Sequence, residues 1–125
     1  MNTKENQTEN VIVNLTFEFA LKIIIYCELL KEERKYEITK QLFRSGTSIG
    51  ANVKEAQGAE SKNDFIHKLK IASKEAEETE YWLFLCEKSK GYPPPEQLLN
   101  DLLSIKKVLG KIISTSKKFA HLHTT

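Results

Sequence analysis

The chain has 125 residues, 40% hydrophobic and 29% charged, which is long enough for one domain whose core needs no disulfide or metal. Its formal net charge of +2 is small, so the overall charge predicts no strong polyanion partner. The polar first ten residues lack the apolar segment of a signal peptide, and an apolar run such as 23–27 is far too short to span a bilayer. We therefore expect a cytoplasmic protein that does not enter a membrane.

The N-terminal part of the chain is expected to be a loosely held polar arm over residues 1–14. Thr16 is a fair N-cap for a first helix, with Glu18 in its first turn and an end near Arg34. Apolar residues surround this helix almost completely, whereas an ordinary surface helix shows one apolar stripe. Such a helix is either central to the fold or shared between subunits.

The second expected helix, about 37–59, contains a stretch, 44–55, that is poor in helix-forming residues. Its glycines, serines, threonine and asparagine together cost about 4–5 kcal/mol relative to alanine. We nevertheless expect one continuous helix, stabilised by close packing, because a helical apolar spacing crosses the stretch without a break. The apolar positions are Ile38, Leu42, Gly46 or Ser45, Ile49, Val53 and Ala56.

Gly46 and Gly50 form a Gly-x-x-x-Gly pair on one face of this second helix. Because neither residue has a side chain, another helix can approach that face closely. Tight packing within a bundle is the favoured interpretation, and a contact between subunits is the alternative.

Two further helices are expected downstream. Ser61, with Asp64 three residues later, is a variant of the capping box and begins a third helix that ends near Lys90, where Gly91 is a natural C′ residue. Three prolines at 93–95 form a stiff connector that also starts the fourth helix. Apolar positions in both helices recur at alternating spacings of four and three, typical of a left-handed bundle. They are Phe65, Leu69, Ala72, Ala76, Thr79, Leu83 and Cys86, then Leu98, Leu102, Ile105, Leu109, Ile112, Ser116 and Phe119.

Together these elements predict an all-α fold, an up-down-up-down left-handed four-helix bundle. The bundle is expected over residues 15–120, followed by a frayed C-terminus at 121–125. No segment alternates with a period of two over a useful length, so strands are not expected.

Polar side chains accompany the apolar positions of the second and third helices. Ser48, Asn52 and Glu55 share one face of the second helix. The favoured interpretation is a solvated edge or a hydrogen-bonded network that fixes helix register. A ligand site or a subunit contact is the alternative.

Two carboxylates, Glu75 and Glu78, lie beside Trp82 on a secondary stripe of the third helix. Arg44 of the second helix is a candidate cationic partner, as are Lys54 and Lys74. The same two interpretations, structural network or binding site, apply to this group.

Metal and nucleophilic chemistry are not indicated. A di-iron bundle needs a Glu-x-x-His on each of two helices, and here only Asp64-x-x-His67 occurs, once and at a helix start. Cys27 and Cys86 lie in apolar helical runs, and buried thiols are favoured over a disulfide or redox role. No nucleophile elbow or phosphate loop is present, so we expect no catalytic residue, no cofactor, no metal and no small-molecule substrate.

The C-terminal helix is basic, because no acid follows Asp101. These lysines are candidate contacts to nucleic-acid phosphates, with a solvated helix face, favourable to the helix dipole, as the competing interpretation. They are Lys106, Lys107, Lys111, Lys117 and Lys118.

Three stretches together resemble a known family. Residues 44–52 read RSGTSIGAN and are followed by Glu55, residues 61–65 read SKNDF, and residues 74–83 read KEAEETEYWL. With the Phe19-Ala20 pair, they are similar to the bacterial four-helix bundle proteins encoded by intervening sequences in 23S ribosomal RNA genes, also called the S23 ribosomal protein family. The resemblance covers about 16–119.

The resemblance implies a bundle that assembles as a homo-oligomer, typically a ring-like pentamer, in a family whose function is generally unassigned. Related accessory proteins of diversity-generating retroelements bind nucleic acid through basic surfaces. We therefore expect a non-catalytic homo-oligomeric scaffold or interaction protein, with an RNA- or DNA-binding module as the alternative. Surplus apolar surface on the first and third helices supports the oligomer independently of the resemblance.

Overall fold

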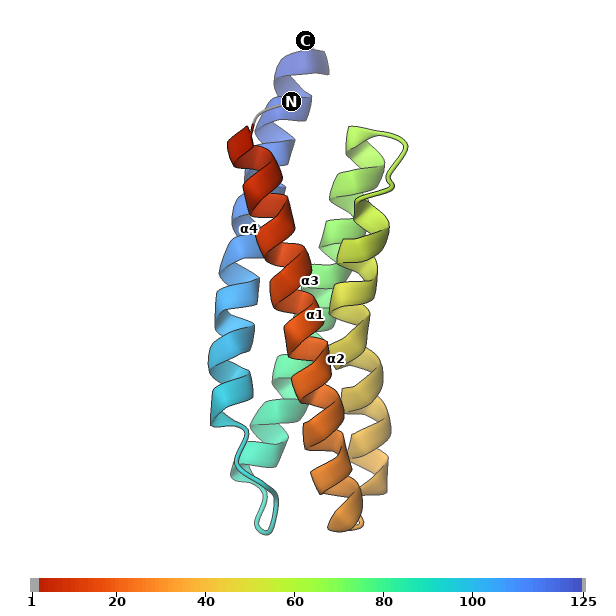
Figure 1. Ribbon diagram of the computed structural model, residues 1–125, viewed down its shortest axis with the longest axis vertical. Coiled ribbons are helices and arrows are strands. Elements are labelled where there is room, and N and C mark those ends of the chain that lie inside the picture. Colours follow the sequence, from red (N-terminus) through yellow and green to blue (C-terminus); the bar gives the residue numbers. More distant parts are fainter. Residues whose placement is uncertain (1–2, 125) are drawn as a thin grey trace.

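A computed structural model describes residues 3–124 of the chain and the side chains of 11–119. Four helices account for it: α1 (Thr3–Glu32), α2 (Tyr36–Ala56), α3 (Lys62–Lys88) and α4 (Glu96–Thr124). They run alternately down and up, and each packs against its two neighbours, with α4 closing against α1 (Figure 1). No strand occurs among residues 3–124, so the all-α, up-down-up-down prediction is confirmed.

The core follows the predicted four-and-three spacing. All seven predicted positions of α3 are buried, and so are six of the seven in α4. Phe119 is the exception, since 48% of it is exposed, and its ring lies 5.3 Å from the Lys62 ammonium group instead of entering the core. The predicted apolar stripe therefore ends one turn early, at Ser116.

Helix α1 begins much earlier than expected. The expected N-cap at Thr16 is wrong, because residues 3–14, which were expected to belong to a loose arm over 1–14, are helical from Thr3 onward; residues 1 and 2 lie outside the described residues. Ile12 is 1% exposed and continues the buried stripe upstream of Phe19. Thr16 lies inside the helix, where its hydroxyl donates to the Ile12 carbonyl oxygen at 2.8 Å. A residue type that suits an N-cap is therefore hydrogen-bonded within the helix instead.

The far end of the chain was expected to fray over 121–125. Helix α4 is continuous to Thr124, so its backbone extends further than predicted. Thr125 and the side chains of 120–124 lie outside the described residues.

The α1–α2 link is a Schellman motif closed by an unusual residue. The Lys35 amide donates to the Leu30 carbonyl and the Arg34 amide to the Lys31 carbonyl, each at 2.9 Å. The helix ends at Glu32, slightly before the expected end, and Arg34 takes the left-handed conformation with φ 61°. Glycine is the usual residue at this position.

Helix α2 ends at Ala56, earlier than its expected end near residue 59, and a turn leads from there to Ser61. The predicted cap is confirmed: the Ser61 hydroxyl oxygen accepts from the Asp64 amide at 3.0 Å. The carboxylate of Asp64 in turn accepts from the Glu60 amide at 3.4 Å, so the reciprocal half of the capping box is displaced by one residue.

The α3–α4 link is tied to α1. Helix α3 ends at Lys88, and Gly91 adopts φ +84° inside the following turn, not directly after the helix as expected. The Tyr26 hydroxyl donates to the Pro93 carbonyl oxygen at 2.6 Å, and the Lys35 ammonium lies 4.8 Å from the Tyr92 ring centroid. These contacts join the two links at one end of the bundle.

We call this end, with the α1–α2 and α3–α4 links, the lower end, as it stands in Figure 1. The start of α1, the α2–α3 link and the end of α4 lie at the upper end. Two ion pairs fix the levels of the helices: Lys22 with Asp101 at 2.8 Å, and Lys106 with Glu80 at 3.1 Å.

The Arg34 conformation gives the first prediction. A left-handed conformation costs a side-chain-bearing residue about 1–2 kcal/mol, so Arg34→Gly should raise the free energy of unfolding by about 1 kcal/mol. The melting temperature should rise by about 3–5 °C in calorimetry. Arg34→Ala keeps the unfavourable φ and should bring no such gain; an equal gain in both variants would contradict the explanation.

Candidate functional site

The segment of α2 that carries most of the family-like motif is continuous helix, as predicted. A Cβ atom added to Gly46 would lie 2.8 Å from Cγ1 of Ile23, and one added to Gly50 would lie 3.2 Å from the Thr16 carbonyl oxygen. Both distances are shorter than ordinary van der Waals contact. The two glycines therefore let α1 and α2 approach closely within one chain.

A buried pair of hydroxyl groups joins α2 to α3 close to the same level. The Thr79 hydroxyl oxygen lies 2.9 Å from Ser45 Oγ and 2.7 Å from the Glu75 carbonyl oxygen, and neither hydroxyl-bearing residue is exposed to solvent. We did not predict this contact. The available signal was that both residues occupy core-facing positions of their helices, where a hydroxyl needs a partner.

The structure brings Arg44, Glu75, Glu78 and Trp82 together. The Arg44 guanidinium donates to Glu75 Oε2 at 3.1 Å and also to Glu78 Oε2, which accepts in addition from Trp82 Nε1 at 3.0 Å. The side chains of Arg44, Glu75 and Glu78 are 49%, 21% and 36% exposed. The group is a charge-assisted cross-link between α2 and α3.

The remaining polar residues of the motif do not join this cross-link. The Ser48 hydroxyl donates to the Arg44 carbonyl oxygen at 2.6 Å, and the Asn52 amide donates to the Ser48 carbonyl oxygen at 2.9 Å. Both bonds stay within α2, and Glu55 lies exposed on its surface. The three residues share a helix face, as expected, without forming a constellation with α3.

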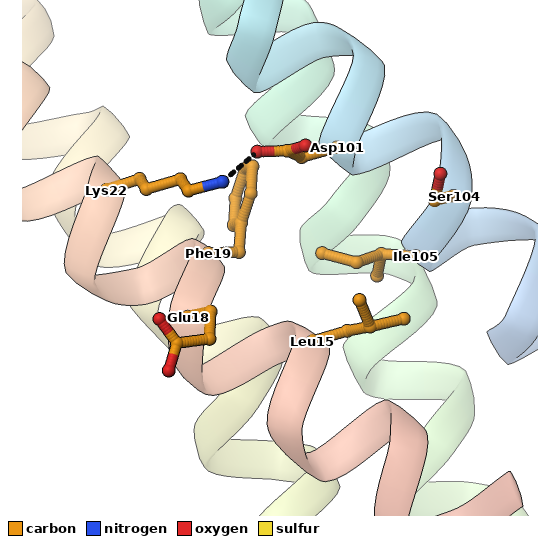
Figure 2. A pocket seen from close by; sticks show the side chains of 7 residues that line it. All are labelled: Leu15, Glu18, Phe19, Lys22, Asp101, Ser104 and Ile105. Atoms are coloured by element: carbon orange, nitrogen blue, oxygen red, sulfur yellow. Dashed lines mark hydrogen bonds and ion pairs between the residues drawn. The ribbon is translucent and has the colours of Figure 1, made fainter.

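Two shallow grooves lie between α1 and α4. The first, of about 110 Å³, lies around the Lys22–Asp101 ion pair; Figure 2 shows these two side chains pointing toward each other and Glu18 pointing away from the pair. The second, of about 270 Å³, is lined by Ile25 and Leu29 of α1 and by the first turn of α4. Both are smaller than the usual range of small-molecule sites, which starts at about 300 Å³.

The two cysteines are free and buried, as predicted. Burial raises the pKa of the Cys27 thiol to about 11 and also raises that of Cys86. Desolvation is the main cause of a raised pKa at Tyr26 as well. Since the thiolate is the nucleophile, both thiols are poorly suited to covalent chemistry at neutral pH.

Metal-ligating residues do not gather in the described part of the chain. No group of three or more His, Cys, Asp or Glu side chains there is arranged to hold an ion. His67 is exposed on α3, whereas the side chains of His121 and His123 lie outside the described range. Within residues 3–124, no helix is long and apolar enough to cross a membrane.

The five predicted lysines of α4 differ in their surroundings. Lys106 bonds to Glu77 at 3.0 Å and to Glu80 at 3.1 Å across the α3–α4 boundary, and these carboxylates offset its desolvation and raise its pKa. Its charge is therefore neutralised within the chain. The other four predicted lysines, Lys107, Lys111, Lys117 and Lys118, are exposed.

Comparison with known proteins decides the family. The family model described as 23S rRNA-intervening sequence protein matches residues 8–114, which is most of the chain. The chain belongs to the 23S rRNA-intervening sequence protein family. No curated protein shows significant similarity to it.

A solved structure supports this family assignment. It is the 1.70 Å crystal structure of a protein of unknown function from the S23 ribosomal protein family of Bacteroides thetaiotaomicron. The two sequences are 44% identical, the match covers 86% of this chain and 98% of the other, and the TM-score is 0.80. Neither match names a catalytic activity.

The glycines of this family member give a matched test of packing. Gly46→Ala should lower the free energy of unfolding by about 1–3 kcal/mol, because the new methyl group overlaps the fully buried Ile23. Gly110→Ala should raise it by about 1 kcal/mol, because a Cβ there meets nothing within 4 Å and alanine favours helix. Urea denaturation measures both, and equal effects at the two sites would contradict the close approach of α1.

The raised cysteine pKa gives a stability prediction with a defined sign. The native state keeps the Cys27 proton to higher pH than the unfolded state, so its contribution is full below pH 9 and is lost as pH rises toward about 11. The limiting slope for one group is about 1.4 kcal/mol per pH unit. Urea denaturation between pH 8 and pH 10.5 should show this decline, and Cys27→Ala should make it shallower. An identical pH slope in the variant would refute the assignment.

Proposed function

We propose that the protein is a non-catalytic, homo-oligomeric helical scaffold, and that its assembly is the ring-like pentamer implied by the family resemblance. The observation that carries this proposal is a stripe of exposed apolar side chains on α1. Phe17, Leu21, Ile25 and Leu29 recur every four residues and are 61%, 42%, 60% and 43% exposed. We call this set the α1 stripe.

The α1 stripe lies on the outer side of its helix, away from the buried positions Phe19 and Ile23. Helix α1 stands in front of the other three in Figure 1, so no other described helix covers its outer side in that view. Over 17–29 the stripe is about 18 Å long. A continuous exposed apolar surface of this kind is typical of an interface between proteins.

A second apolar group, on α3 and α4, supplies a complementary surface. Tyr81, Phe84, Leu85 and Leu103 are 58%, 45%, 39% and 49% exposed. Because α3 and α4 are antiparallel and Lys106 bonds to Glu80, Leu103 lies opposite Phe84, one turn below that ion pair.

The two apolar surfaces lie at the same level of the bundle. Lys22 lies on α1 at the level of the middle of the α1 stripe, and it bonds to Asp101. Asp101 is two residues before Leu103 on α4. Both surfaces therefore occupy the lower half. Two different surfaces at one level favour head-to-tail contact between parallel bundles, which closes into a ring when the rotation between copies allows it.

The non-catalytic part of the proposal is supported by the chemistry of the site. The motif residues Arg44, Glu75, Glu78 and Trp82 contact one another, the two grooves are small, and the buried thiols have raised pKa values. A structural role in holding α2 against α3 accounts for the motif residues without a substrate.

The assembly can be tested by light scattering coupled to size-exclusion chromatography. The native chain should elute as one multimer at micromolar concentration. The double variant Phe17→Glu/Ile25→Glu should be monomeric or at least tenfold weaker in association, because two desolvated carboxylates would enter the interface. Circular dichroism should show unchanged helix content, since both side chains are exposed in the single chain.

Val11→Glu is the matched control. Val11 is an exposed apolar residue of the same helix, 47% exposed, but it lies above the α1 stripe. The variant should keep the native mass. A monomeric native chain, or equal loss of assembly in the control, would rule out the proposed interface.

A further inference from the structure

The charges of α3 and α4 are sorted along their lengths. In α3, residues 65–74 contain three lysines and no acid, whereas residues 75–87 contain five glutamates and no basic residue. In α4, Glu96 and Asp101 come first and no acid follows. Since the helices are antiparallel, both basic segments lie in the upper half of the bundle and both acidic segments in the lower half.

Six exposed lysines, from the middle of the bundle upward, form what we call the basic strip. In the described part of the chain, none of them has a carboxylate within ion-pair distance. Because α3 and α4 are antiparallel and Lys106 bonds to Glu80, Lys117 lies at the level of Lys70, and its charge lowers the Lys70 pKa. The strip therefore crosses the boundary between the two helices. The residues are Lys70, Lys74, Lys107, Lys111, Lys117 and Lys118.

The nearest acid on this face is Glu77, whose carboxylate is engaged by Lys106 at 3.0 Å. This contact marks the lower boundary of the strip. Like charges gathered without counter-charges destabilise a chain, so the arrangement is not explained by folding.

Gly110 lies within the strip, three residues after Lys107 and seven before Lys117, on the same face of α4. A glycine inside a helix costs about 1 kcal/mol relative to alanine. Gly46 and Gly50 are required by the approach of α1, but a Cβ on Gly110 would meet no described atom within 4 Å. An uncovered helix backbone lets a ligand approach closely.

We propose that the basic strip binds the sugar-phosphate backbone of a single-stranded nucleic acid, which passes over Gly110 between the lysines of α3 and those of α4. The strip is about 16 Å long over 107–118. Lysine supplies point charges without the planar geometry used to read bases, so recognition is of the backbone and independent of sequence.

The surface chemistry favours nucleic acid over a membrane. Binding to a membrane surface usually adds apolar side chains that insert between lipids. On α4, the exposed residues on the strip between Lys107 and Lys117 are Gly110, Lys111 and Ser114, none of which is apolar. The proposed subunit contacts occupy the lower half and border the strip only at Lys107, one turn above Leu103, so the rest of the strip stays accessible in the assembly.

Fluorescence anisotropy of a labelled 20-nucleotide oligouridylate with the full chain, from 25 to 300 mM KCl, tests the proposal. Affinity should fall steeply with salt. Lys111→Gln/Lys117→Gln should weaken binding at least tenfold at 50 mM KCl and reduce the slope of log K against log salt by about 1.4. Lys40→Gln/Lys90→Gln removes the same charge from exposed sites outside the strip and should change neither value appreciably.

Gly110→Gln separates binding from folding. The open space around Gly110 accommodates the new side chain, so the melting temperature should not fall, whereas binding should weaken about threefold or more. Absence of binding at 25 mM KCl would overturn the proposal, and so would equal losses in the two lysine double variants. Binding to vesicles containing phosphatidylserine, without binding to the oligonucleotide, would overturn it in favour of a membrane surface.

Discussion

The close approach of α1 and α2 is the contact on which the rest of the bundle depends. Gly46 packs on Ile23 at a separation that leaves no room for a methyl group, and Gly50 packs on the Thr16 carbonyl, where a methyl group would fit only if the backbone shifted slightly. The segment around them is intrinsically a poor helix, so tertiary packing rather than propensity keeps it helical. Once α1 and α2 are held together, the Ser45–Thr79 hydroxyls and the Arg44 cross-link place α3 against α2.

This arrangement leaves the two ends of the bundle chemically different. The lower half carries the α1 stripe, the aromatic and leucine side chains of α3 and α4, and most of the acidic residues of α3. The upper half carries the basic strip. Antiparallel packing produces this separation, because it pairs the end of each helix with the start of the next. One small bundle can therefore offer a surface for assembly and a separate surface for a polyanion.

Much of the fold could be predicted from the sequence, because apolar spacing of four and three is a property of each helix alone. The N-terminal boundary could not, since Thr16 suits a cap and only the packing of Ile12 shows that the helix continues. The buried seam of α4 stops short of Phe119 because its ring lies against Lys62.

The candidate site was only partly predictable for a related reason. Composition identified the lysines of α4 but could not show that Lys106 is neutralised by two glutamates of α3, or that Lys70 joins the others across the helix boundary.

The buried hydroxyl pair of Ser45 and Thr79 also affects how α2 and α3 align. A purely aliphatic seam tolerates sliding by whole turns, but any other alignment of α2 on α3 would break the hydrogen bond between Ser45 and Thr79, so this pair favours the observed alignment over near-equivalent ones.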